Sequence, residues 1–344
     1  MLSRALLVDT SPRGRAAAGE WPKDRGQRSV LQTILKKTSR AVVIAACFWL
    51  PEEKKVGLER WLRGRSEYRA LQRADVVIAA FGKSGRTWLR VMLSSVVRLT
   101  SGESEAALLG SARRSRSMPR IFFTHDNYIQ DYTGNPGSKA HFAGKRVVLL
   151  VRDPRDVTVS QYFQWKHRMK HKKTRVNHYP PKGTEIPIYD FVMNPRYGLV
   201  RCVDFLNVWA RENERVPDLL VVRYEDLRSQ PVENLSRIVD FVGLEATPAV
   251  IEQAVEESSV EKMRKLEASN TSMLAGGRLK PGDRGNADSY KVRRAKVGGY
   301  RDYFSDDEVA RIDAYIEEHL LPDFGYSGAP PPQGEMASSA GHRS

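Results

Sequence analysis

Residues 76–88 read VVIAAFGKSGRTW, an apolar, β-branched run followed at once by a turn that contains two glycines. An apolar run this short indicates a strand covered on both faces, as in parallel sheets. Glycines allow a tight turn in which several backbone N–H groups point at one anion, and a following helix N-terminus adds partial positive charge. Lys83, Ser84 and Thr87 add side-chain donors. The stretch predicts a strand, a phosphate-binding loop and a helix over residues 87–99; the alternative is an ordinary strand-to-helix turn.

The same strand–turn–helix order recurs further along the chain. Strands are expected at 121–124, 147–151 and 219–223, and helices at 155–170 and 231–242. Repeated units of this kind form right-handed βαβ crossovers, and ligands bind at the carboxyl ends of their strands. We therefore predict an α/β fold: a P-loop-like, doubly wound, mostly parallel sheet flanked by helices, in one main domain over residues 75–321.

The regions outside this domain differ from it in composition. Residues 1–40 are read as a loosely ordered basic arm, residues 41–73 as an N-terminal helical extension and residues 322–344 as a disordered tail. Within the extension, residues 41–50 (AVVIAACFWL) are too few to cross a bilayer. They form either a core element or, because lysines flank them and Phe48 and Trp49 lie near their end, an interfacial segment in weak peripheral contact with a membrane.

Charge and cysteine content restrict the function classes. The 344 residues include 56 Lys and Arg against 41 Asp and Glu, a net charge of +15 that favours an anionic partner such as a nucleotide, a phosphate, an acidic glycan or a membrane surface. The two cysteines, Cys47 and Cys202, exclude a disulfide framework and a Cys-based zinc site. They fit a reducing compartment, so a cytoplasmic location is expected.

Arginine follows the predicted strand at 147–151, where a magnesium-dependent NTPase would place a metal-binding Asp. Arg152 is suited to a phosphate because its guanidinium donates two parallel hydrogen bonds. Ser160 follows eight residues later, about two helical turns on, and is expected to reach the same anion. The alternative is a structural ion pair between Arg152 and Asp153 or Asp156.

Four segments, in order, resemble the sulfotransferase family that uses 3′-phosphoadenosine 5′-phosphosulfate (PAPS). FGKSGRTW at 81–88 resembles its 5′-phosphosulfate loop, and RDPRDVTVS at 152–160 its 3′-phosphate motif. RYEDL at 223–227 is similar to a Y-E-D-L/M segment, and YKVRRAKVGGYRDYF at 290–304 to an R-K-G-x-x-G-D-W-K-x-x-F stretch. The chain departs from these patterns at several positions, among them Gly82, Arg86, Phe123, Ala295 and Gly299-Tyr300.

The resemblance implies a role for each matching residue. Lys83 would contact the bridging oxygen of the phosphosulfate, and Trp88 would stack on the adenine. The other implied donor contacts are Ser84, Gly85, Arg86 and Thr87 on the 5′-phosphate; Arg152, Ser160, Arg293 and Arg294, followed by Ala295, on the 3′-phosphate; and Tyr224 and Ser259 along the nucleotide.

Phe123-Thr124-His125 resembles the K-T-H segment that carries the family's catalytic base, so His125 is the candidate base. A neutral imidazole accepts a proton at physiological pH. The alternative is a histidine with a structural role in the core. The remaining histidines are expected in loops or on the surface: His141, His167, His171, His178 and His319.

The resemblance implies transfer of a sulfuryl group from PAPS to an acceptor hydroxyl or amine by in-line displacement, without a metal. A nucleotide donor and a hydroxyl-bearing acceptor, with an anionic glycan or lipid as one option, are the expected partners, and no nucleic acid is expected. One alternative is a P-loop kinase that uses ATP and Mg²⁺, which Val77 at the first glycine position of its loop pattern disfavours. The other is a non-catalytic protein that binds polyanions or membranes.

Two further segments bear on the acceptor. Residues 166–182 (KHRMKHKKTRVNHYPPK) are strongly basic. They form either a solvated charged surface or a region that attracts an acidic acceptor. Residues 269–289 form a long polar stretch with several glycines, which we interpret as a lid.

Overall fold

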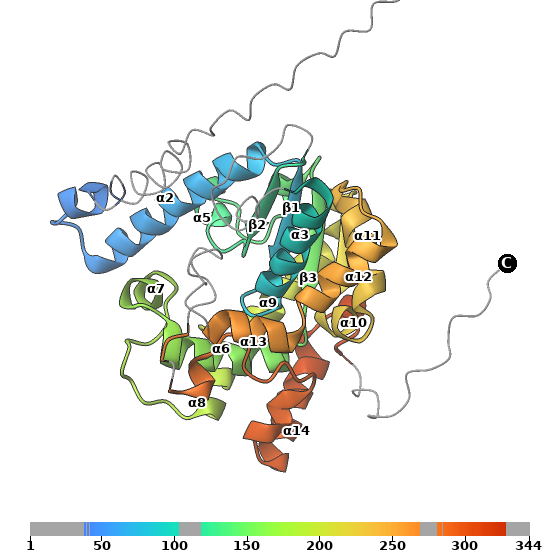
Figure 1. Ribbon diagram of the computed structural model, residues 1–344. Helices are drawn as coiled ribbons and strands as arrows, with labels where there is room; N and C mark the ends of the chain where they lie inside the picture. The colour runs from blue at the N-terminus through green and yellow to red at the C-terminus, as the bar shows by residue number, and fades with distance from the viewer. Residues whose placement is uncertain are drawn as a thin grey trace, which may run out of the picture.

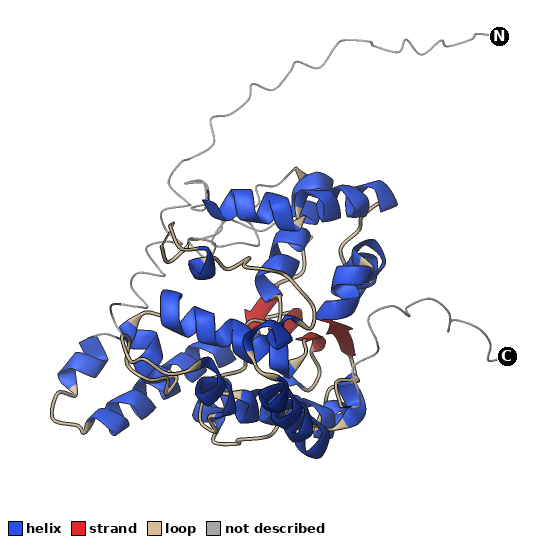
Figure 2. Ribbon diagram, turned by 90° about the horizontal axis from the view of Figure 1, so that it is seen from below, coloured by secondary structure: helices blue, strands red, loops and turns tan. Residues whose placement is uncertain are grey.

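The computed structural model describes residues 38, 40, 42–102, 118–268, 281–283 and 285–327. Within them, four parallel strands form one sheet in the spatial order β2–β1–β3–β4, with helices on both faces (Figure 1, Figure 2). The strands are β1 (Val76–Ala80), β2 (Ile121–Thr124), β3 (Arg146–Val151) and β4 (Leu219–Arg223). The predicted α/β fold with a parallel, helix-flanked sheet is confirmed.

The strand register brings the carboxyl ends to one edge of the sheet. β1 pairs in parallel with both β2 and β3, and Ala79 lies opposite Thr124 on one side and Leu149 on the other. The glycine-containing loop after β1, His125 after β2 and Arg152 after β3 therefore leave the sheet at a common edge. This is the edge at which open α/β sheets bind their ligands.

Alternation of side chains along each strand builds two apolar layers. Val76 and Ile78 belong to the layer covered by α3 (Arg86–Ser101), α11 (Pro231–Val242) and α12 (Pro248–Glu257). Val77 belongs to the layer that includes α9 (Leu199–Arg211) and α14 (Asp306–His319). Both layers are fully buried at the centre of the sheet, because helices cover each face.

The strand predicted at 219–223 is present as β4, and it lies at the edge of the described sheet. β4 pairs only with β3 among the described strands, and Val221 is 37% exposed. An edge strand has a neighbour on one side only, so part of its surface meets solvent even when its sequence is apolar.

Helix α2 (Glu52–Gln72) packs beside the sheet (Figure 1). Arg60 connects it to α5 (Ile129–Thr133) through Asp131, with Nη2 2.9 Å from Oδ2. The same guanidinium donates to the Val176 carbonyl at the end of α7 (His171–Val176), 2.9 Å away. The division of the chain at residue 75 stays a prediction, and the predicted arm and tail lie outside the described residues, apart from residues 38, 40 and 322–327.

The predicted helix at 155–170 corresponds to α6 (Pro154–Arg168). The described residues also form the helices α8 (Ile188–Met193), α10 (Tyr224–Ser229) and α13 (Val260–Ala268). Short 3₁₀ turns are η1 (Ala140–Phe142), η2 (Asn213–Arg215), η4 (Ala287–Ser289), η5 (Gly299–Tyr303) and η6 (Pro322–Phe324).

The apolar run at 41–50 is not a core element where the structure describes it. Val42, Phe48 and Trp49 are 66%, 77% and 67% exposed, and the Phe48 and Trp49 rings meet edge to face. The core alternative is therefore wrong for these side chains. No helix among the described residues combines the length and apolarity needed to span a bilayer.

Candidate functional site

A cavity of about 1260 Å³ lies at the carboxyl ends of β1, β2 and β3. Most of the predicted site residues line it: Lys83, Gly85, Arg86, Thr87, Trp88, His125, Arg152, Ser160, Tyr224, Arg293, Arg294 and Ala295. Ser84 is buried and Ser259 precedes the lining residue Val260, so neither side chain forms part of the wall. Segments more than 200 residues apart in the sequence thus meet in one cavity.

The loop after β1 has the backbone of an anion-binding turn. Lys83 and Gly85 adopt positive φ angles of 76° and 92°. A Cβ at Gly85 would lie 2.6 Å from Cδ2 of Tyr224, so only glycine allows the loop to pack against this ring. The N-terminus of α3 then follows with no side-chain cap, and Arg86, Thr87 and Trp88 of its first turn line the cavity. Its backbone dipole therefore faces the site.

Lys83 lies among like charges. Burial and the neighbouring guanidiniums of Arg168 and Arg152 lower the pKa of Lys83 to about 7, and Arg293 acts in the same direction. Part of the Lys83 population is therefore neutral at physiological pH. An anion bound in the cavity would favour the charged form.

His125 occupies the first position after β2. Its Nδ1 lies 2.9 Å from the Ala80 carbonyl oxygen. Because a carbonyl oxygen only accepts, Nδ1 carries the proton and donates it, which leaves Nε2 as an acceptor in the neutral ring. Burial, followed by the nearby Arg86 charge, holds the pKa of His125 well below its usual range. The imidazole is neutral and able to accept a proton.

Arg152 combines the two roles considered for it. Its Nη2 is 3.4 Å from Asp156 Oδ2, a long ion pair, and its guanidinium stacks over the Tyr224 ring at 4.3 Å. Its Nη1 donates to the Lys83 carbonyl, 3.3 Å away, while the side chain lines the cavity. The ion pair with Asp156 thus orients a guanidinium that is presented to the cavity.

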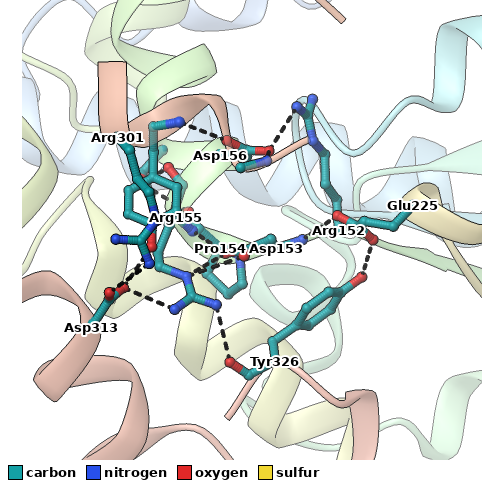
Figure 3. Close-up of polar contacts among 12 residues, drawn as sticks. Arg152, Asp153, Pro154, Arg155, Asp156, Glu225, Arg301, Asp313 and Tyr326 are labelled. Atoms are coloured by element: carbon teal, nitrogen blue, oxygen red, sulfur yellow. Dashed lines mark hydrogen bonds and ion pairs between the residues drawn. The ribbon is translucent and has the colours of Figure 1, made fainter. Parts of the chain in front are cut away.

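A polar network holds the start of α6 behind Arg152 (Figure 3). Asp153 caps the helix by accepting from the Arg155 backbone N–H at 2.9 Å. Arg155 Nη1 lies 2.9 Å from Asp313 Oδ1, and its Nη2 donates to the Tyr326 carbonyl at 3.2 Å. The Asp153 N–H donates to Glu225 at 3.1 Å, and that carboxylate also accepts from the Tyr326 hydroxyl. The network ties α6 to α14 and to the chain after it.

Asp156 brings the C-terminal part of the chain to the cavity. Its two carboxylate oxygens accept from the backbone N–H groups of Gly298 and Tyr300, at 2.9 and 3.0 Å. Arg293 and Arg294 precede these anchors and line the cavity. Between the arginines and the anchors, Ala295 adopts a φ of +54° at the position where the sulfotransferase motif has Gly. This conformation favours glycine and explains why the motif uses it.

A second anchor holds the same segment from the other side. Glu267 of α13 is fully buried and accepts from the Lys291 and Val292 backbone N–H groups, at 2.5 and 2.9 Å. It also pairs with Arg168 of α6 at 2.6 Å. Together, Glu267 and Asp156 fix the two ends of the arginine-bearing segment against α6.

The aromatic wall of the cavity is formed around Trp88. Its indole Nε1 donates to the Ser258 carbonyl at 2.7 Å, and its ring centroid lies 5.9 Å from that of Tyr224. The Arg228 guanidinium lies over the Trp88 ring, 5.8 Å from the ring centroid. The side chain is thereby held in one orientation at the cavity wall.

Sequence reasoning did not single out several lining residues, most notably Glu67 of α2. Its Oε2 accepts from the Thr124 hydroxyl at 3.3 Å, directly before His125. Burial raises the pKa of Glu67 to about 7. Arg63, Arg228 and Lys291 also line the cavity. No motif marks Arg63 and Glu67, because which face of α2 meets the cavity depends on how that helix packs.

The expected surface position of His141 is wrong. Its side chain is 6% exposed, and its Nε2 lies 3.3 Å from Asp126 Oδ1. The other oxygen of Asp126 binds Lys139 at 2.5 Å. A buried carboxylate thus draws both neighbouring side chains inward.

The basic run at 166–182 divides into two groups. Lys172 and Arg175 pair with acidic residues of α2, whereas Lys170, Lys173 and Lys182 line the cavity.

The predicted lid at 269–289 lies outside the described residues over 269–280 and 284. The described Pro281 and Gly282 line the cavity beside the end of α6.

Comparisons with known proteins place the chain in a family. The sulfotransferase domain family matches residues 73–323. Flavonol 3-sulfotransferase from Flaveria bidentis is 25% identical over 270 residues, covering 72% of this chain and 81% of that protein. Cytosolic sulfotransferase 13 from Arabidopsis thaliana is 24% identical over 302 residues, covering 80% and 84%.

Similar solved structures include mouse sulfotransferase SULT7A1 complexed with PAP, with a TM-score of 0.48, 17% identity and coverage of 75% of this chain and 90% of that one. Retinol dehydratase in complex with androsterone and the inactive cofactor PAP has a TM-score of 0.48 and 19% identity, covering 72% and 81%. Because the family match spans most of the chain, this protein belongs to the sulfotransferase family of enzymes.

Proposed function

We propose that this chain transfers a sulfuryl group from PAPS to an acceptor hydroxyl or amine by in-line displacement, with His125 as the base and Lys83 stabilising the leaving group. The observation that carries the proposal is the meeting of a glycine-containing anion loop, a neutral histidine and three arginines in one cavity. Family membership overturns the two alternatives weighed from sequence, a P-loop kinase and a non-catalytic polyanion- or membrane-binding protein.

The lining residues fit a donor with two anionic ends. The backbone turn at Lys83–Gly85 and the uncapped start of α3 suit the 5′-phosphosulfate. Arg152, Arg293 and Arg294 suit a 3′-phosphate, and Trp88 offers a flat surface for a base. The family resemblance assigns the same residues to the same two ends of the donor. The structures of retinol dehydratase and SULT7A1 both contain PAP.

The reaction needs one proton transfer and one displacement. The acceptor oxygen attacks sulfur while the bond between sulfur and the bridging oxygen breaks, so the nucleotide leaves with the electron pair of that bond. Negative charge grows on the bridging oxygen, and a cation fixed there stabilises the transition state more than the ground state. Lys83 supplies that cation, and Nε2 of His125 takes the acceptor proton.

Replacing Arg152 by alanine tests where the donor's 3′-phosphate binds. A charge-assisted hydrogen bond contributes roughly 1.5–3 kcal/mol, so the donor Kd is expected to rise about 10–150-fold while kcat at saturation changes far less. Wild type should prefer PAPS over adenosine 5′-phosphosulfate, which lacks the 3′-phosphate, and the variant should lose most of this preference. Kd is measured by calorimetry.

Arg311→Ala on the exposed surface of α14 serves as the matched control and should bind both donors like wild type. An Arg152→Ala variant that keeps the full preference for the 3′-phosphate would show that another residue binds that group. A chain that binds neither nucleotide would contradict the proposed function itself.

We also propose a cytoplasmic location with weak peripheral contact to anionic membranes. Several relatives are named cytosolic sulfotransferases, and the residues Phe48 and Trp49, whose rings are exposed, precede Lys54 and Lys55 in the sequence. Aromatic rings with nearby lysines suit the membrane–water interface.

Flotation of the full chain with phosphatidylglycerol vesicles tests the membrane contact. Wild type is expected to float partly with these vesicles and not with phosphatidylcholine vesicles. The double variant Phe48→Asp/Trp49→Asp should stay at the bottom, because it loses apolar insertion and adds repulsion. Val232→Asp, at an exposed apolar side chain of α11, is the control for adding an acidic residue to the surface. Equal flotation of wild type and the double variant would contradict the proposed membrane contact through Phe48 and Trp49.

A further inference from the structure

Tyr326 is a buried residue near the C-terminal end of the described chain. The sulfotransferase domain family matches residues 73–323, so Tyr326 lies beyond the matched part, and it is 4% exposed. Its hydroxyl donates to Glu225 Oε2 at 2.6 Å (Figure 3). Tyr326 is not among the described residues that line the cavity. Any effect of this side chain on a bound nucleotide therefore passes through other residues.

The ring and backbone of Tyr326 are held by contacts that do not need its hydroxyl. The Arg223 guanidinium lies over the Tyr326 ring, 4.7 Å from the ring centroid. The Tyr326 carbonyl accepts from Arg155 Nη2 at 3.2 Å, and the Gly325 carbonyl accepts from Arg223 Nη2 at 3.4 Å. Tyr326→Phe therefore removes the hydroxyl and leaves the ring and the backbone contacts in place.

Glu225 connects the Tyr326 hydroxyl to the backbone beside Arg152. Its Oε1 accepts from the Asp153 N–H at 3.1 Å, and this N–H belongs to the peptide bond between Arg152 and Asp153 (Figure 3). The residue before Glu225 is Tyr224, whose ring centroid lies 4.3 Å from the Arg152 guanidinium. Two adjacent residues of α10 thus hold Arg152, one at its backbone and one at its guanidinium.

The hydrogen bond between Tyr326 and Glu225 has a fixed direction. Burial, followed by the Glu225 charge, raises the pKa of Tyr326 well above its usual range, so the phenol keeps its proton and donates. Burial also raises the pKa of Glu225, whereas the Tyr326 hydroxyl and the Asp153 N–H act in the opposite direction. Hydrogen bonds to a charged acceptor are stronger than those between neutral groups, so this pair restrains the carboxylate firmly.

We propose that Tyr326 is a positioning residue for the donor's 3′-phosphate: its hydroxyl fixes Glu225, and Glu225 fixes the peptide bond after Arg152. The inference rests on the proposed function, which places the 3′-phosphate on Arg152. A bidentate contact with a phosphate depends on the orientation of the guanidinium. Without the Tyr326 hydroxyl, the Glu225 carboxylate and the backbone that it holds gain freedom. Phosphate binding then has to remove that freedom, which lowers the affinity.

Binding of two nucleotides to Tyr326→Phe tests the inference. Adenosine 3′,5′-bisphosphate (PAP) carries the 3′-phosphate and adenosine 5′-monophosphate (AMP) does not, so the ratio of their Kd values reports on the 3′-phosphate site. Tyr326→Phe should lower the preference for PAP about three- to tenfold, a fraction of the 10–150-fold expected for Arg152→Ala. At saturating PAPS, kcat should stay within about twofold of wild type. Calorimetry measures both Kd values, on protein whose folding is checked by circular dichroism.

Two comparisons separate positioning from a general loss of stability. Tyr162→Phe removes a tyrosine hydroxyl of α6 that donates to the Ile186 carbonyl at 3.2 Å, and this variant should keep the wild-type preference. Adding Tyr326→Phe to Arg152→Ala should change the ratio of Kd values no further, because the guanidinium through which Tyr326 acts is gone. A general loss of stability would act on both nucleotides alike.

Glu225 offers a second pair of variants, which carries the test if Tyr326→Phe does not fold. Glu225→Gln keeps an oxygen for the Asp153 N–H, whereas Glu225→Ala removes it. Glu225→Ala should therefore lose more of the preference for PAP than Glu225→Gln. Equal preference in these two variants would contradict the proposed role of the carboxylate.

The outcomes also distinguish this inference from the proposed function. If Arg152→Ala loses the preference for PAP while Tyr326→Phe keeps it, the inference is overturned and the proposed function stands. The same holds if Tyr326→Phe lowers the preference equally in the presence and absence of the Arg152 side chain. If PAP does not bind to wild type, the proposed function fails and the inference fails with it.

Discussion

Replacing His125 by alanine is expected to lower kcat about 10²–10⁴-fold while the donor Kd stays near its wild-type value. Loss of a general base typically costs this much, and the base acts on the acceptor rather than on the nucleotide. The Ala80 carbonyl holds the ring through Nδ1, so the variant removes an oriented Nε2 acceptor. Single-turnover transfer of label and calorimetric donor binding measure the two quantities separately.

His319→Ala is the control for this experiment. His319 belongs to α14, stacks on Tyr315 and does not line the cavity, so its loss should leave kcat unchanged. If His125→Ala retains near-normal turnover, a group other than His125 accepts the proton of the acceptor. Glu67 would then be the next group to replace, because it accepts from the Thr124 hydroxyl, directly before His125, and its pKa of about 7 suits proton transfer.

Replacing Lys83 by alanine is expected to lower kcat about 10²–10³-fold, the range for loss of a group that stabilises developing negative charge. Donor binding should weaken much less than kcat falls. The charge on the bridging oxygen appears only as the bond to sulfur breaks, so the missing interaction belongs to the transition state. Rapid-quench measurement of the chemical step at saturating donor separates this effect from product release.

The lowered pKa of Lys83 adds a second signature. In the donor-free protein this pKa is about 7, because of burial and the Arg168 and Arg152 charges. The anionic donor should raise it, so between the two values binding takes up a proton and the donor Kd weakens as pH rises above about 7. Calorimetry at pH 8 in buffers of different ionisation enthalpy detects this proton.

Lys83→Arg keeps the charge and cannot deprotonate in this range. It should bind donor without proton uptake, which isolates the contribution of Lys83 from that of the nucleotide's own phosphates. Equal proton uptake by wild type and Lys83→Arg would show that Lys83 is already charged in the free protein.

The strands and the residues directly after them were predictable because local pattern and one topological rule determine both. Short apolar runs identify the central strands, and a parallel sheet brings their carboxyl ends together, so Lys83, His125 and Arg152 were expected to meet before any contact was known. The edge position of β4 was not predictable, because it depends on the order of the strands in the sheet. The sequence pattern of a buried strand does not record that order.

Contacts between distant elements were not predictable. Glu67 reaches the cavity because Arg60 fixes α2 against α5 and α7, and nothing in the spacing of 52–72 marks that face. His141 is buried because Asp126 lies opposite it. Lys172 and Lys173 are adjacent in a run of like charges, yet one pairs with Glu59 and the other lines the cavity. Only the packing of α7 against α2 separates their environments.

The anchoring of the arginine-bearing segment by Asp156 has a consequence during synthesis of the chain. Asp156 binds N–H groups of residues that follow it by more than 140 positions. A ribosome that has completed the four strands has therefore synthesised Arg152 but not Arg293 and Arg294, the other two arginines proposed for the 3′-phosphate. The nascent sheet can fold early, since its pairings are made, but it remains unable to hold its nucleotide tightly until nearly the whole chain has emerged.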